Sequence, residues 1–285
     1  MTAPEKAVPE RTDPAVPTDP AVPPDPAVPT DADVAAYALR LGDDALVLGQ
    51  RLAEWAARSP QIEEDVALLN IALDHFGAAR SLLTYAGQLA GPHADTNAIR
   101  TEDDLAFLRD ESAFTNALLM EVDGGDFGRT MARQLLVAAY QLPLWQALTT
   151  STDPQIAGVA GKSVKEAAYH LDHARSWIVR LGDGTDESHG RVQLGLDEVW
   201  PYAAELFERD DLTARLVTRG VAADPALLEP VWRQTVEQVL AEATLSVPET
   251  TWRPTGGRSG AHTTGFGYLL AELQHLHRSH PGASW

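Results

Sequence analysis

The chain has 285 residues, with 22 Lys and Arg against 41 Asp and Glu, so its formal net charge is −19. This acidity argues against electrostatic binding to nucleic acid or to an anionic membrane, because both require basic side chains to meet phosphate. There is no cysteine, which excludes a disulfide framework, a thiolate zinc site, an iron–sulfur cluster and a cysteine nucleophile. Any metal would need carboxylate and imidazole ligands.

The start of the chain lacks the charged residues and apolar run of a signal peptide. No later stretch approaches the roughly 18 uninterrupted apolar residues of a membrane helix. We therefore expect a cytoplasmic protein.

The first thirty residues contain the sequence Asp-Pro-Ala-Val-Pro three times, beginning at Asp13, Asp19 and Asp25. Two prolines in every six residues prevent a helix and remove backbone donors, which favours an extended, polyproline-like chain. We predict that residues 1–30 form a disordered, proline-rich tail. It is either a spacer or a ligand for a proline-binding groove on a partner.

From Asp31 onward apolar residues recur with the period of a helix, and no period-two pattern dominates. Proline after a capping residue, at Ser59-Pro60 and Asp153-Pro154, marks two helix starts. Four long helices are expected over about residues 33–57, 60–88, 127–150 and 154–182. Further helical stretches are expected over about residues 102–120, 188–208, 225–245 and 263–279. We predict one all-α domain, residues 31–285, built as a four-helix bundle with additional C-terminal helices.

Apolar stripes identify the expected core faces of the first two long helices. The first stripe consists of Leu41, Ala45, Leu48, Leu52 and Trp55. The second consists of Ile62, Val66, Leu69, Leu73, Phe76 and Leu83. Residues at these spacings share one helix side, so both stripes are predicted to be buried.

Carboxylates at inward positions of such a bundle could bind iron. Diiron bundles use a Glu on each of two helices and a Glu-x-x-His on each of the other two. Here the inward carboxylates are Asp44, Asp74 and Glu166. The histidine positions three residues after Asp74 and Glu166 hold Gly77 and Tyr169, so neither helix completes the motif.

The remaining polar candidates are weaker ligands. Gln134 and Gln141 are the inward polar residues of the third long helix, which has no glutamate. His170 and His173 follow Glu166 on one helix face, which is either half a metal site or an ordinary Glu–His pair with a histidine that faces a partner.

Three further residues have expected structural roles. His75 points about 100° away from Asp74 around its helix, so we expect it at the surface or an interface. Asp44 and Asp74 should be buried and held by hydrogen bonds or by a basic side chain such as Arg80.

A glycine-rich run at residues 255–260 precedes the last helix. No strand comes before it, as a phosphate-binding loop would require, although a phosphate cradle is an alternative. We predict a tight loop whose backbone positions Arg258 and His262.

Several segments resemble the C-type (PaaC) subunits of bacterial phenylacetyl-CoA epoxidases, also called phenylacetate-CoA oxygenases. The segments are Tyr37–Asp44, Asn70–Asp74, Lys165–His170, Gly256–Arg258 with Gly260, His262 and Thr263, and Pro281–Trp285. The similarity covers roughly residues 33–285. The repeat tail lies outside the family pattern.

This resemblance implies a ferritin-like fold and a place in a cytoplasmic, NADPH-dependent monooxygenase complex of aerobic phenylacetate catabolism. It also implies that a related A-type subunit carries the diiron centre and the CoA thioester, with further small and reductase subunits in the complex. This chain would then be a structural subunit with no catalytic residue, metal ligand or cofactor of its own. Its vestigial ligand positions would be Asp44, Asp74, Glu166 and His170.

Two other functions compete with this one. The chain could be an autonomous ferritin-like diiron oxidase or iron-binding protein that uses the same four residues. It could also be a helical binding module that recruits its partner through the proline-rich tail.

Deleting residues 1–30 should leave the melting temperature almost unchanged, because the tail offers no periodic apolar face to bury. Differential scanning calorimetry of the full-length and shortened chains measures this. A decrease of several degrees would mean that the tail packs on the bundle.

Overall fold

The computed structural model describes residues 30–92 and 98–283. Within them the structure is helical, with no strand beyond one isolated bridge between Pro92 and Ile99, which confirms the all-α prediction. The α-helices are α1 (Asp31–Ala53), α2 (Ile62–Ala90), α3 (Glu102–Phe107), α4 (Leu118–Glu121), α5 (Phe127–Leu148), α6 (Pro154–Gly182), α7 (Asp186–Val199), α8 (Asp211–Thr218), α9 (Pro225–Glu242) and α10 (Phe266–Ser279). The 3₁₀ helices are η1 (Glu111–Ala113), η2 (Trp200–Phe207) and η3 (Gly257–Ser259).

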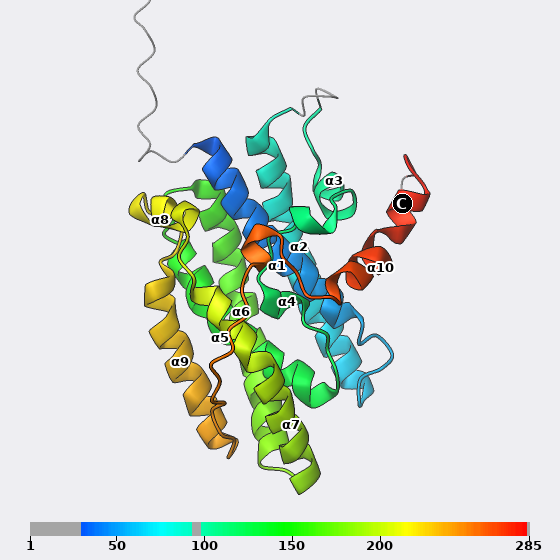
Figure 1. Cartoon of the computed structure of the whole chain (residues 1–285), viewed down its shortest axis with the longest axis vertical. Helices are drawn as coiled ribbons and strands as arrows, with labels where there is room; N and C mark the ends of the chain where they lie inside the picture. Colours follow the sequence, from blue (N-terminus) through cyan, green and yellow to red (C-terminus); the bar gives the residue numbers. More distant parts are fainter. Residues whose placement is uncertain (1–29, 93–97, 284–285) are drawn as a thin grey trace, which may run out of the picture.

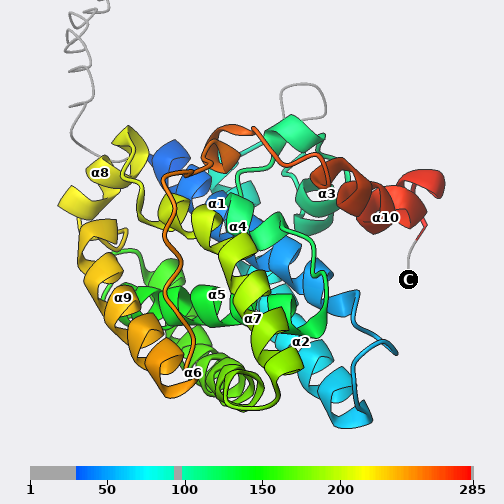
Figure 2. The ribbon, with the colours of Figure 1, turned by 60° about the horizontal axis from the view of Figure 1, so that its bottom comes forward.

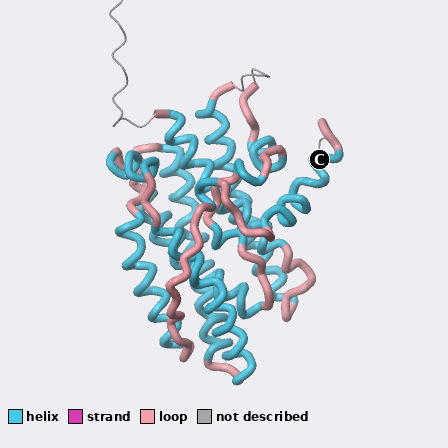
Figure 3. Tube along the Cα trace, viewed as in Figure 1, coloured by secondary structure: helices cyan, strands magenta, loops and turns pink. Residues whose placement is uncertain are grey.

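Four long helices form the bundle that positions everything else. Helix α1 packs along α2, α5 packs along α6, and α2 meets α6 (Figure 1). Helices α7 and α9 cover α5, and α10 lies against α3 and η1 (Figure 2). Buried apolar side chains from α1 to α10 belong to one core cluster. A long loop leads from α9 back along the outside to η3 (Figure 3).

The start of α1 coincides with the end of the predicted tail. Thr30 is the N-cap residue: its hydroxyl accepts a hydrogen bond from the Asp33 amide, and the Asp33 carboxylate accepts one from the Thr30 amide. Residues 1–29 lie outside the described residues. The deletion that leaves this capping box intact therefore ends at residue 29.

The segment expected as one helix over residues 102–120 is instead three short pieces, α3, η1 and α4. Its backbone takes other partners: the amides of Thr115 and Ala117 donate to the carboxylates of Asp43 and Asp44 on α1. These bonds replace those a helix would supply. Helix α8 was not anticipated at all.

The core face of α2 differs from the predicted stripe. Ile62, Val66 and Leu73 are exposed, at 74%, 57% and 63% of their full accessible areas. The buried face is rich in alanine, with Ala72, Ala78, Ala79 and Ala86 among its residues. Small side chains let α1 approach so closely that a Cβ on Gly49 would lie 2.8 Å from the Phe76 ring. The inner face therefore combines small side chains that admit α1 with large ones such as Leu68 and Leu83, and of these Leu83 belongs to the predicted stripe. The α1 stripe, by contrast, is buried as predicted from Leu41 to Leu52.

Helix α2 is also the one helix in the described part that is long and apolar enough, by length and composition, to cross a membrane. A core helix of a bundle passes the same test. Here one side of α2 packs on α1 and α6, which accounts for much of its apolar character.

Candidate functional site

The expected iron-binding positions do not come together as one site. Asp74, Glu166 and His170 lie between α2 and α6, where His170 Nε2 is 3.1 Å from Asp74 Oδ2. Glu166 pairs with Lys162 on its own helix, at 3.4 Å, and not with His170. Asp44 belongs to a separate group of residues on the other side of α1, with Arg258 and Ala117 as its partners. The predicted Glu–His pair on α6 is therefore absent from the described interactions.

Two other histidines fill the space between α2 and α6. His173 Nε2 lies 2.9 Å from Glu64 Oε2, so this histidine is paired inside the chain. His75 is buried, and its ring centroid is 5.0 Å from that of His170, so the prediction of a surface position for His75 was wrong.

Asp44 is buried and held by a basic side chain, as predicted, but that side chain is Arg258. Asp74 is not buried as predicted, since its side chain is 35% exposed. Arg80 is not the partner of either aspartate, because it is exposed and binds Glu102.

Burial dominates the electrostatics of this imidazole cluster. It lowers the pKa of His75 well below the ordinary value, and the nearby charges of His170 and Arg133 lower it further. Burial also lowers the pKa of His170 despite the hydrogen bond with Asp74. Burial raises the pKa of the Glu166 carboxyl. All three shifts favour the neutral forms of these side chains.

A buried guanidinium lies near the same imidazoles. Arg133 on α5 is almost fully enclosed and donates one hydrogen bond to the Val122 carbonyl. Its Nε and Nη2 have no hydrogen-bond partner among the described residues. Burial lowers its pKa to about 10, which leaves it charged at neutral pH. Gln134 and Gln141, the other inward polar residues of α5, are buried as well.

These residues do not fit a diiron centre. In the part of the chain that the structure describes, no three His, Asp or Glu side chains are grouped so that they could hold a metal ion. The motif positions carry Gly77 and the exposed Tyr169. The charge of Arg133 already disfavours a proton on His75 and would oppose a divalent cation in the same way.

A second polar group, which we call the α1 clamp, consists of Asp43 and Asp44 with Arg109 and Arg258. Arg258 Nη1 and Nη2 lie 2.9 and 2.8 Å from the two oxygens of Asp44. Arg109 binds both oxygens of Asp43 in the same way. Although burial lowers the pKa of Arg258, the neighbouring Asp44 carboxylate outweighs this and raises it. The clamp thus holds two charge-assisted, bidentate pairs inside the fold.

A histidine–glutamate pair extends the clamp towards α10. Glu121 Oε2 lies 2.7 Å from His262 Nδ1 and accepts a hydrogen bond from Asn116 Nδ2 at 2.8 Å. His262 Nε2 is 3.1 Å from the carbonyl oxygen of Phe114. Because both ring nitrogens face acceptors, this geometry favours a ring that is protonated on both. Burial lowers the pKa of His262, but the bond to Glu121 and its charge raise it overall.

The glycine-rich loop makes this arrangement possible. A Cβ on Gly257 would lie 2.4 Å from the Asn116 carbonyl oxygen, and one on Gly260 would lie 2.3 Å from that of Ser112. Gly260 also has a φ of +79°. Glu205 accepts hydrogen bonds from the amides of Leu118 and Gly256. The prediction of a tight loop that positions Arg258 and His262 is therefore confirmed.

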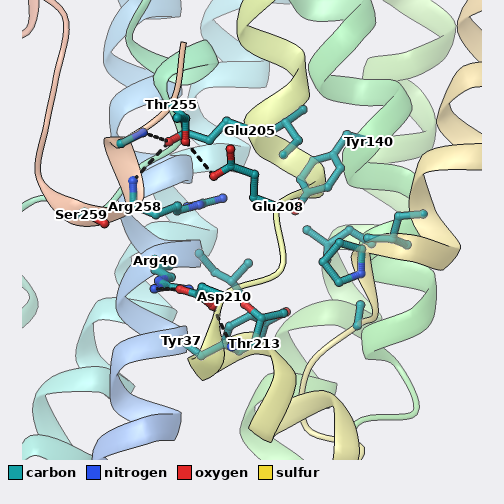
Figure 4. Close-up of a pocket in the computed structure, with 17 residues that line it drawn as sticks. Tyr37, Arg40, Tyr140, Glu205, Glu208, Asp210, Thr213, Thr255, Arg258 and Ser259 are labelled. Atoms are coloured by element: carbon teal, nitrogen blue, oxygen red, sulfur yellow. Dashed lines mark hydrogen bonds and ion pairs between the residues drawn. The ribbon is translucent and has the colours of Figure 1, made fainter. Parts of the chain in front are cut away.

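Next to the clamp is a cavity of about 120 Å³ (Figure 4). Tyr37, Tyr140 and Arg258 contribute to its wall. Burial raises the pKa of Tyr140 to about 12. The charged side chains that line the cavity are already bound to other residues, as Arg40 is to Asp210. They are thus engaged in holding the fold together.

The fold and these sites define an all-α protein of the ferritin-like bundle class. The chain belongs to the phenylacetic acid catabolic protein family, whose model matches residues 23–285. It is similar to the C-type subunit of the 1,2-phenylacetyl-CoA epoxidase of Escherichia coli (strain K12). The two sequences are 45% identical over 252 residues, which cover 88% of this chain and 99% of the relative.

Replacing Asp44 by alanine should lower the free energy of unfolding by about 3–5 kcal/mol, because it leaves the Arg258 guanidinium buried without its counter-ion. Asp74→Ala is the matched control and should cost less, since the Asp74 side chain is 35% exposed. Urea denaturation of both variants measures the difference. Equal losses of unfolding free energy would mean that the Asp44–Arg258 pair contributes no more to stability than the partly exposed Asp74.

The His262–Glu121 pair should make stability depend on pH. A raised folded-state pKa gives a stabilisation that is complete below the ordinary imidazole value of about 6.5 and is lost as the pH rises through the raised value. The stability advantage of the wild-type chain over His262→Gln should therefore shrink as the pH increases from about 6 to about 9.

Urea denaturation across this pH range measures that advantage. The control is His275→Gln, at an exposed position on α10. An advantage that stays constant with pH would contradict the doubly protonated ring.

Proposed function

We propose that this chain is a non-catalytic structural subunit of a multicomponent phenylacetyl-CoA ring epoxidase and stabilises the diiron catalytic subunit. The family membership and the name of the E. coli relative support a role in such an epoxidase. The observation that favours a structural role is the buried guanidinium of Arg133, whose charge acts on His75 and lowers the pKa of that imidazole further below the value that burial gives it.

The electrostatic argument is direct. Two iron ions carry several positive charges, which a bundle site must balance with inward carboxylates. Helix α5 has no glutamate and instead buries the guanidinium of Arg133, whose Nε and Nη2 have no hydrogen-bond partner among the described residues. Placing an iron cation beside the Arg133 guanidinium would be strongly unfavourable, because the bundle interior has a low dielectric constant.

The partners in this proposal follow from the same assignment. The diiron centre and the CoA thioester would lie on an A-type oxygenase subunit, and a reductase would deliver electrons from NADPH. Further small subunits would complete a cytoplasmic complex of aerobic phenylacetate catabolism. This chain would contribute no cofactor of its own.

The rival proposal, an autonomous diiron oxidase or iron-binding protein, requires Asp44, Asp74, Glu166 and His170 to act together. Asp44 is bound to Arg258 and the Ala117 amide, so it is not available to an ion near His170. The rival is therefore weaker. The third function, recruitment by the tail, depends on residues 1–29, which lie outside the described residues.

Reconstitution of the epoxidase with and without this chain tests the proposal. The isolated chain should bind no stoichiometric iron and oxidise no phenylacetyl-CoA, whereas the complete complex should lose activity when the chain is omitted. Glu166→Gln and His170→Gln should each change turnover by less than about tenfold, while loss of a true ligand in the A-type subunit should abolish it. Two irons per chain, or full activity without the chain, would refute a structural role.

A further inference from the structure

The proline-rich tail has a period of three residues inside its repeat of six. From Asp13 to the start of α1, proline stands at every third position: Pro14, Pro17, Pro20, Pro23, Pro26 and Pro29. A polyproline II helix has three residues per turn, so in that conformation these prolines lie along one ridge. Such a ridge is the ligand that aromatic-lined grooves bind in proline-recognising domains.

The described part of the chain has a groove with walls of the matching kind, which we call the η2/α9 groove. It has a volume of about 790 Å³ and lies between η2, α9 and residues 247–253 of the long loop after α9 (Figure 3). Its wall contains three aromatic rings and two prolines: Trp200, Phe207, Trp232, Pro201 and Pro248. Trp200 and Phe207 are half-buried and pack on the buried Trp232, with ring centroids 5.4 and 5.1 Å away. They therefore form a fixed aromatic surface.

The groove lies within reach of the tail. Glu208 lines both the groove and the cavity beside the α1 clamp, and Tyr37 of α1 lines that same cavity (Figure 4). Tyr37 is six residues after the first residue of α1, which is about 9 Å along the helix. Residues 13–29 would extend about 50 Å as a polyproline II helix. The tail is thus long enough to bring a repeat into the groove.

The charges of the groove are close to balanced, so recognition depends on the rings. Three glutamates and two arginines line it, and Glu229 pairs with Arg233 at 2.9 Å. Arg253 is exposed and has no ion pair among the described residues. An aspartate precedes the first ridge proline of every repeat, and Arg253 is its available partner.

Attachment to the same chain favours the tail over other proline-rich ligands. A short flexible connection gives a tethered segment an effective concentration of the order of 1 mM, whatever the concentration of the protein. The tail of a second copy lacks this advantage. It would also have to approach together with another net charge of −19.

We propose that the η2/α9 groove binds the chain's own proline-rich tail, with one Pro-Ala-Val-Pro unit lying across the rings of Trp200 and Phe207. The prolines of that unit pack on the rings, and the aspartate before it pairs with Arg253. The tail is then a ligand of its own bundle.

This docking is weak. One unit of four residues covers little surface, so we expect a dissociation constant of about 1 mM, close to the effective concentration of the tail. A segment that is bound about half of the time stabilises the fold by RT ln 2, which raises the melting temperature of a chain of this size by only about 1–2 °C. Docking is therefore compatible with the small effect expected from deleting the tail, and its test needs a local probe.

The test uses the full-length chain and the ¹⁵N indole NMR signals of its tryptophans, assigned by single replacements with phenylalanine. The tail variant replaces the six ridge prolines by alanine, which keeps length and charge. We expect the Trp200 signal to shift in this variant, while that of Trp55, which packs on Phe127, stays in place. A synthetic peptide of residues 13–23, added to the tail variant, should restore the wild-type position with a dissociation constant of about 1 mM. The same peptide with alanine for proline should bind at least tenfold more weakly.

Substitutions in the groove provide the second arm. Val247→Asp, at a residue that is 40% exposed in the groove wall, should weaken binding of the peptide at least tenfold. The matched control is Val66→Asp, at a residue that is 57% exposed on α2, and it should leave binding unchanged. Melting curves establish that both variants fold. If Val247→Asp does not, Arg253→Glu takes its place and should weaken binding at least threefold.

The other outcomes overturn the proposal in distinct ways. If the Trp200 signal is the same in the wild-type chain and the tail variant, and the peptide does not move it, the groove binds no polyproline II ligand. If only the peptide moves it, the groove accepts proline-rich segments but the tail is not its occupant. If the wild-type signal moves towards that of the tail variant on dilution, the tail occupies the groove of a second copy. None of these results alters the structural role proposed above.

Discussion

The structure depends on two adjacent aspartates, Asp43 and Asp44, buried in the middle of α1. Two carboxylates inside a core are tolerated only if cations and backbone amides compensate them. Arg109 and Arg258 supply the charges, and Thr115 and Ala117 supply the amides. Meeting this demand fixes the path of the segment between α3 and α4 and brings the glycine-rich loop back to the first helix.

The two polar regions of the bundle have opposite electrostatic designs. At the α1 clamp every charge has a counter-charge, and Glu121 raises the pKa of the neighbouring His262 against the effect of burial. Between α2 and α6 the imidazoles of His75 and His170 are pushed towards neutrality, and Arg133 has no anion bonded to it among the described residues. The first region is built to hold segments together. In the second region the buried charge is the positive charge of Arg133, whereas a metal site there would need negative charge.

Helical periodicity and capping were enough to predict the all-α class, the four long helices and the start of α6 at Pro154. Periodicity alone could not tell which of two apolar sides of α2 faces inward, because the choice depends on how closely α1 approaches its alanines. The sequence also did not reveal Glu121 and Glu205 as buried acceptors. Their partners include backbone amides and residues more than 80 positions away, which no local pattern encodes.

The Asp44–Arg258 pair joins residues 214 positions apart in the chain. During synthesis α1 and α2 are complete long before Arg258 is made. Until then the Asp44 carboxylate has no cation to compensate its charge when α1 packs into the core. The final packing of α1 must wait for the last tenth of the chain. A non-local contact of this kind slows folding, since loop closure must precede the gain in energy. The α1 clamp therefore makes native packing a property of the nearly complete polypeptide, and a chain interrupted before residue 258 leaves the Asp44 carboxylate without its cation.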